Sequence, residues 1–206
     1  MHYIVEKYVK TWYYEAKGFK GCDITETLVA DRPVYIIVSQ TGTILSRVLK
    51  LITRKQYNHA SISFNEDLKT MYSFGRIRPY NPFLAGFVTE SANFGTFKRF
   101  KNTRVLVVEL LVLENKYEDL KTFVEEMLKH PEKYGYNYLG LYLAALKISF
   151  KSDNRYYCSE FVKEILVSQD IDGANKLKKI IHPMSFLDLP KTQVIYEGLL
   201  REYNCS

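Results

Sequence analysis

One cysteine in this sequence stands where a thiol nucleophile would be expected. Cys158 lies in the segment Tyr156-Tyr157-Cys158-Ser159-Glu160, and apolar residues follow it at positions 161, 162, 165 and 166. That spacing predicts a helix with one face in the core and Cys158 in its first turn. Free backbone N–H groups and the positive end of the helix dipole both favour a thiolate there, which would suit attack on a carbonyl carbon. The alternative is a small buried hydrophobic residue that closes a helix.

A cysteine nucleophile needs a base within hydrogen-bond reach, and His59 is the best placed of the four histidines. It opens a predicted strand in which His59, Ser61 and Ser63 share one face, so a rigid backbone would hold its ring. His2 lies close to the N-terminus, His130 ends a predicted helix, and His182 precedes a proline in a loop. These three fit structural roles better than a catalytic one.

The elements that must position this pair alternate between strands and helices. Apolar runs and alternating patterns predict strands near 34–38, 57–64, 69–74, 87–91, 105–110 and 193–197. Helical spacing predicts helices at 43–53, 117–128, 139–148 and from 158 onward. Hairpin strands mixed with separate helices indicate an α+β fold with a central antiparallel sheet packed against helices. We expect a single domain over 1–206, with an N-terminal extension at 1–31, a core at 32–190 and a C-terminal strand and tail at 191–206.

Composition excludes several classes of function. The 206 residues carry a formal net charge of +6, but the positive residues are dispersed and form no recognised nucleic-acid module. Cys22, Cys158 and Cys205 show no paired spacing, which argues against a disulfide framework or a clustered zinc site. No run approaches the roughly 20 apolar residues of a membrane span, and no secretion signal is visible. We therefore expect a cytoplasmic protein that needs no metal or other cofactor and binds no nucleic acid.

The order of two motifs resembles a known family. Asn58-His59-Ala60-Ser61-Ile62 precedes Tyr156-Tyr157-Cys158-Ser159-Glu160-Phe161-Val162 by about a hundred residues. In this order the pair is similar to the circularly permuted papain-like hydrolases, the YiiX-like branch of the NlpC superfamily, which is related to the lecithin:retinol acyltransferases. The resemblance covers about 34–189. It implies a permuted papain-like fold in which Cys158 attacks a carbonyl, His59 transfers the proton and the backbone N–H of Cys158 helps to hold the oxyanion.

The resemblance leaves the third catalytic residue open. Related enzymes place a polar residue on the strand after the histidine strand, which makes Ser73 the positional candidate and Glu90, one strand later, the alternative. Tyr156, Tyr157 and Arg76 are the residues expected to line the oxyanion site or contact the substrate. The predicted function is a thiol hydrolase acting on an amide or ester of a peptide or acyl substrate. An acyltransferase using the same Cys–His pair, or an inert binding protein on the same fold, remains the alternative.

Overall fold

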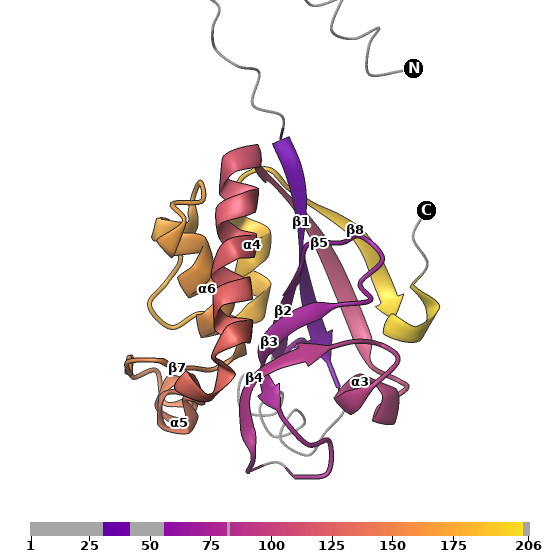
Figure 1. Cartoon of the computed structure of the whole chain (residues 1–206), viewed down its shortest axis with the longest axis vertical. Helices are drawn as coiled ribbons and strands as arrows, with labels where there is room; N and C mark the ends of the chain where they lie inside the picture. The colour runs from indigo at the N-terminus through magenta and orange to yellow at the C-terminus, as the bar shows by residue number, and fades with distance from the viewer. Residues whose placement is uncertain (1–30, 42–55, 82, 204–206) are drawn as a thin grey trace, which may run out of the picture.

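The computed structural model describes residues 31–41, 56–81 and 83–203. The predicted helix at 43–53 and nearly all of the predicted N-terminal extension lie outside these ranges. Within them, the chain forms an α+β fold built on one sheet with the strand order β7-β6-β4-β3-β2-β1-β5-β8 (Figure 1). Neighbouring strands are antiparallel except for β6 and β7, which run parallel.

The strands follow the apolar runs of the sequence closely. Their bounds are β1 (Asp31–Gln40), β2 (His59–Ser63), β3 (Met71–Arg76), β4 (Ala85–Glu90), β5 (Arg104–Leu113), β6 (Gly135–Tyr136), β7 (Arg155–Tyr156) and β8 (Thr192–Leu199). All six predicted strands are confirmed. The two-residue strands β6 and β7 were not predicted, because two residues carry no periodic pattern.

The helices lie between and beside these strands. The α-helices are α3 (Gly95–Arg99), α4 (Glu114–Lys129), α5 (Tyr138–Ala145) and α6 (Cys158–Ser168), and the 3₁₀ turns are η1 (Pro131–Lys133), η2 (Ala174–Lys176), η3 (Pro183–Asp188) and η4 (Leu200–Glu202). The predicted start of a helix at Cys158 is confirmed, as are the helices matching α4 and α5. The short helix α3 was not predicted, because its single buried residue, Phe97, gives no stripe.

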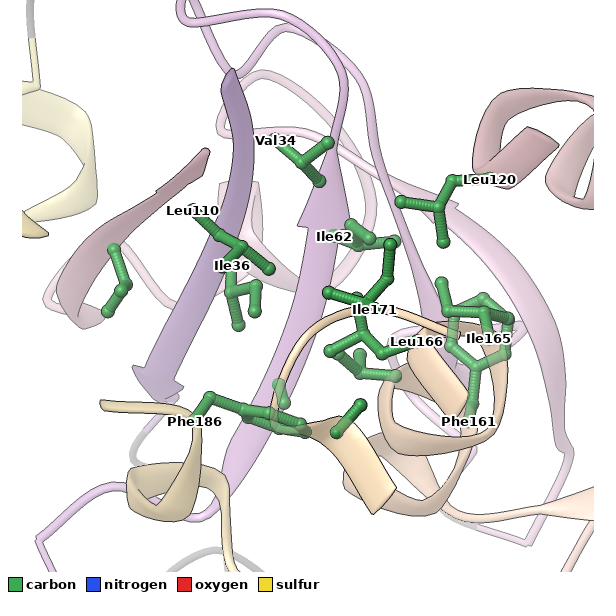
Figure 2. Packing of buried hydrophobic residues seen from close by; sticks show 14 of the residues in the cluster. Val34, Ile36, Ile62, Leu110, Leu120, Phe161, Ile165, Leu166, Ile171 and Phe186 are labelled. Carbon is green, nitrogen blue, oxygen red and sulfur yellow. The ribbon is translucent and has the colours of Figure 1, made fainter. Parts of the chain in front are cut away.

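One face of the sheet is covered by α4 and α6, and this side holds the larger core (Figure 1). Phe161 and Ile165 of α6 belong to the same buried cluster as Ile36 of β1 and Ile62 of β2 (Figure 2). The Phe161 ring also meets those of Phe74 and Phe87, at centroid distances of 5.4 and 5.5 Å. This apolar contact fixes α6 across β2 and β3, and therefore fixes the place of its first residue.

The opposite face carries a second, smaller core. Because successive side chains of a strand point to opposite faces, Tyr35 and Ile37 of β1 leave the first core and pack with Phe97 of α3 and Leu200 of η4. On β2, the same alternation sends Ala60 and Ile62 to the α6 side and leaves His59 and Ser61 on the other. The His59 ring contacts Phe97 edge-on at 6.2 Å between centroids.

Candidate active site

The cysteine and the histidine selected from the sequence meet at one end of the sheet. Cys158 is the first residue of α6 and its side chain is buried, with 5% of the residue exposed. The thiol lies close enough to the His59 ring for a charge on the sulfur to act on the imidazole. The sulfur also lies 3.9 Å from the carbonyl oxygen of Asn58, the residue immediately before β2. The two residues are 99 positions apart in sequence and become neighbours because α6 packs across β2.

A carboxylate holds the other side of the imidazole. Nε2 of His59 lies 3.0 Å from both Oε1 and Oε2 of Glu90, and the hydroxyl of Ser61 donates to Oε2 at 2.6 Å. Since Nε2 faces the carboxylate, Nδ1 is the ring nitrogen left for the thiol. The side chains of His59 and Glu90 are 16% and 10% exposed, so this ion pair is largely screened from water. Cys158, His59 and Glu90 therefore form a connected chain of polar groups.

The positional candidate for the third residue lies elsewhere. The Ser73 hydroxyl donates to the carbonyl oxygen of Ala60 at 2.6 Å, within the buried interior of the sheet. The structure therefore places the alternative candidate, Glu90, against the imidazole. Counting strands favoured Ser73, but the side chain of Glu90 crosses the face of β3 to reach His59.

That crossing depends on a small residue on β3. A Cβ atom added at Gly75 would lie 3.2 Å from Oε1 of Glu90 and 3.7 Å from Cε1 of His59. The carboxylate and the imidazole thus meet directly above Gly75, in space that any larger side chain would enter. Gly75 was not selected from the sequence, because it directly follows the strand predicted at 69–74, whereas in the structure it lies within β3.

The charges around His59 favour its protonated form. Burial alone would lower the pKa of the imidazole, but the negative charges of Glu90 and of ionised Cys158 outweigh it and hold the pKa well above the usual value for histidine. An imidazolium beside a thiol at a helix N-terminus stabilises the thiolate. The arrangement can therefore supply a nucleophile and a proton donor at neutral pH.

The start of α6 is tied to the segment that carries β6. Oε2 of Glu160 accepts hydrogen bonds from the backbone N–H of Tyr157 at 3.3 Å and from the Asn137 amide at 3.1 Å. The backbone N–H of Asn137 in turn donates to the carbonyl of Tyr156 at 3.0 Å. These bonds fix Cys158 relative to β6 and bring Tyr136 close to it.

Tyr136 lies close enough to Cys158 for a charge on the sulfur to act on its phenol. Burial, followed by the charge of ionised Cys158, raises the pKa of Tyr136 well above its usual value, so its hydroxyl keeps its proton at neutral pH. The Tyr156 ring instead packs against Phe74 on the core side, 5.3 Å between centroids. Tyr136 was missed because the motif that pointed to this site lies after residue 150, whereas Tyr136 comes from the neighbouring strand.

Two further predicted residues flank the site. Tyr157 is buried, and burial together with the charges of Glu160 and Cys158 raises its pKa. Arg76, the last residue of β3, is partly buried, and burial together with the positive charge of Arg99 lowers its pKa. The phenols of Tyr136 and Tyr138 lie close enough to Arg76 to act on it in the opposite direction.

The remaining histidines of the described ranges have structural roles. His182 caps η3, where its Nδ1 accepts a hydrogen bond from the backbone N–H of Met184 at 3.2 Å. His130 follows α4, and its exposed ring lies 3.4 Å from Glu132. His2, Cys22 and Cys205 lie outside the described residues. In the part of the chain that the structure describes, no cluster of histidine, cysteine and acidic residues could hold a metal ion.

Among the described residues, no helix is long and apolar enough to cross a membrane.

Comparison with known proteins adds no family to this description. No protein-family model matches the sequence, and no curated protein matches it at a significant level. The geometry of Cys158, His59 and Glu90 therefore carries the functional argument.

Proposed function

We propose that the protein is a thiol hydrolase that cleaves an amide or ester bond through an acyl-enzyme intermediate. The observation that carries this proposal is the His59 ring, held by both oxygens of Glu90 at 3.0 Å and close to the buried thiol at the start of α6. A positioned base, a group that orients it and a thiol at a helix N-terminus are the parts that nucleophilic cysteine catalysis requires.

The reaction follows from the positions of these groups. Cys158 loses its proton to His59, and the thiolate attacks the substrate carbonyl to form a tetrahedral intermediate. The His59 imidazolium then gives its proton to the leaving amine or alcohol, which leaves a thioester on Cys158. In the second half, His59 accepts a proton from water, hydroxide attacks the thioester, and the carboxylic acid product leaves as the thiol is restored.

Two donors are available for the developing oxyanion. The backbone N–H of Cys158 belongs to the first turn of α6, where N–H groups have no partner within the helix. We propose the hydroxyl of Tyr136 as the second donor, since a phenol keeps its proton at neutral pH and this one lies close to Cys158. Arg76 provides a positive charge near these groups and would favour a substrate with an anionic group nearby.

We further propose that the fold is the permuted papain-like arrangement. The resemblance of the two motifs supports it, since the histidine strand comes before the cysteine helix in the chain. The eight-stranded, mostly antiparallel sheet with α6 packed across it is compatible with that arrangement. An acyltransferase differs from the hydrolase in the acceptor alone, an amine or alcohol in place of water.

The experiment is labelling of Cys158 by iodoacetamide and by acyl and peptidyl electrophiles, read by mass spectrometry of the modified peptide. We expect rapid labelling of Cys158 at pH 6 and slow labelling of the His59→Ala variant, with His130→Ala as a matched control. A thiol that reacts only near the free-thiol range of about pH 8.5, equally in both proteins, would favour an inert binding protein. Release of acid from a trapped acyl-enzyme, compared with transfer to added amines or alcohols, separates hydrolase from transferase.

A further inference from the structure

A cavity between α5 and α6 lies beside the proposed active site without including its reacting groups. Its volume is about 430 Å³, which falls within the usual range for sites that bind small molecules. The walls come from α5, from the segment 148–151 that follows it, from the first two turns of α6 and from residues 179–180. Neither Cys158 nor His59 lines it.

Half of this α5–α6 cavity is apolar. Ala144 on α5, Ile148 and Phe150 in the following segment, and Ile180 on the opposite side supply this surface. Ile148 and Phe150 remain 50% and 39% exposed, which is unusual for large apolar residues that face a hollow. A ligand with an apolar body would remove this surface from water.

The other half of the cavity is charged, and its charges do not cancel. Nζ of Lys151 lies 2.9 Å from Oε1 of Glu164, so these two residues neutralise each other. Glu160 already accepts bonds from Asn137 and from the backbone N–H of Tyr157, and burial raises its pKa. The lining therefore carries three lysines against two acids, and within the described residues Lys163 and Lys179 form no salt bridge.

These two lysines differ in what they contact. Nζ of Lys163 donates to the carbonyl oxygen of Lys178 at 2.9 Å, a neutral acceptor that leaves its charge uncompensated. Burial, and then the positive charges of Lys151 and Lys179, act to lower the pKa of Lys163 against the opposing pull of Glu164 and Glu160. An anion placed between Lys163 and Lys179 would be attracted by both positive charges.

We propose that the α5–α6 cavity is a second binding site, which takes a small amphipathic anion: a carboxylate or phosphate head between Lys163 and Lys179, with an aliphatic or aromatic body against Ile148 and Phe150. The head and the body each match one half of the cavity. The ligand would lie against Tyr157 and Glu160, one and two residues from Cys158 along the chain. The site stands independently of the hydrolase proposal.

Calorimetric titration with octanoate tests this site, with 1-octanol as the uncharged probe of the same length. We expect octanoate to bind and octanol to bind at least about tenfold more weakly, because an ionised head gains charge-assisted hydrogen bonds. The double variant Lys163→Gln/Lys179→Gln should lose the same factor, whereas Lys176→Gln, an exposed lysine of the same segment, should bind as the wild type does.

A second variant fills the cavity without touching a charge. Ala144→Phe places a ring in the apolar half and should abolish octanoate binding, while circular dichroism and thermal unfolding show that each variant is folded. The proposal fails if octanoate does not bind, or if it binds both variants as tightly as the wild type. It also fails if alkylation of Cys158 abolishes binding while the variants do not, since octanoate would then occupy the active-site cleft. Hydrolase activity does not enter these measurements, so the two proposals succeed or fail separately.

Discussion

Replacing Glu90 with glutamine tests how the imidazole is charged. The substitution keeps the size of the side chain and one oxygen that can accept from Ser61 or His59, but it removes the negative charge. In the native protein that charge lies against Nε2 of His59 at 3.0 Å, with both side chains largely buried. Without it, the charge of Cys158 alone opposes the effect of burial on the His59 pKa, so the neutral imidazole is more favoured than in the native protein.

The size of the effect follows from the distance and the surroundings. Two unit charges about 4 Å apart interact by about 4 kcal/mol at an effective dielectric constant of about 20. Part of this remains in the variant, because the amide oxygen still accepts a hydrogen bond. A net loss of about 1.5–3 kcal/mol corresponds to roughly a 10- to 100-fold smaller population of the thiolate–imidazolium pair at neutral pH.

The assay is the second-order rate of iodoacetamide alkylation at Cys158, measured from about pH 5 to pH 8 with peptide-level mass spectrometry. We expect the Glu90→Gln variant to react about 10- to 100-fold more slowly than the wild type near pH 6, with the gap closing as the pH rises. The same substitution at Glu66, an exposed carboxylate on the turn after β2, should leave the profile unchanged.

The Ser73→Ala variant tests whether Ser73, and not Glu90, orients the imidazole of His59. Ser73→Ala removes a buried hydrogen bond to the Ala60 carbonyl and should lower stability by about 1 kcal/mol without changing the alkylation profile. If Ser73→Ala slows alkylation near pH 6 while Glu90→Gln reacts like the wild type, the imidazole is not oriented by Glu90.

Three further predictions concern the surroundings of this pair. Gly75→Ala brings a methyl group to 3.2 Å from Oε1 of Glu90, so alkylation at Cys158 should slow several-fold with a stability loss of about 1 kcal/mol. The pKa of His59 is raised in the folded protein, so the charged imidazole should stabilise it. In a Cys158→Ala background, the protein with His59 should therefore be more stable than the His59→Gln variant, with the full difference present below about pH 6.5. Urea unfolding at a series of pH values should show this difference disappear as the pH rises through the folded-state pKa. Phe161→Ala should cost about 3–5 kcal/mol in urea unfolding, because the ring is 1% exposed.

Control variants and contrary outcomes accompany these three predictions. The methyl group of Gly86→Ala would lie 3.4 Å from the terminal methyl of Ile77 and 3.7 Å from the carbonyl oxygen of Tyr134, which are ordinary contacts, and should leave alkylation unchanged. Val167→Ala on α6 removes a side chain that is 38% exposed and should cost less than about 1 kcal/mol. A stability advantage of His59 that grows as the pH rises from 6 to 9 would contradict the raised pKa, and an equal loss from the Gly86 and Gly75 substitutions would contradict the close packing above Gly75.

The sequence predicted the elements that repeat a pattern over several residues. The apolar runs of β1 and β5 and the stripe of α6 beginning at Cys158 each carry enough periodic positions to fix their type. The shortest strands could not be predicted, since β6 and β7 form through backbone bonds to each other and to β4. Such pairing depends on tertiary contacts that no local pattern records.

Within the site, the sequence predicted which residue types would meet but not which neighbour would complete them. Cys158 and His59 could be selected because a motif surrounds one and a polar strand face carries the other. The exchange of Ser73 for Glu90 arose because strand order alone says nothing of how far a glutamate reaches across its neighbour. Gly75 is the missing piece of information, since the absence of a side chain there opens the path for that reach.

The energetics of the His59–Glu90 pair give an independent reason to connect it with chemistry. Taking two charges out of water costs about as much as their attraction returns, so a buried ion pair is a poor source of stability, and apolar residues of similar size often do as well or better. Here the pair also requires a hydroxyl at Ser61 and an open space above Gly75. Four residues on three strands, His59, Ser61, Gly75 and Glu90, thus act together to keep one imidazole protonated next to one thiol. Folding alone does not require this arrangement. Nucleophilic catalysis by a thiol does require it, because the thiolate must attack and a neighbouring group must then supply a proton.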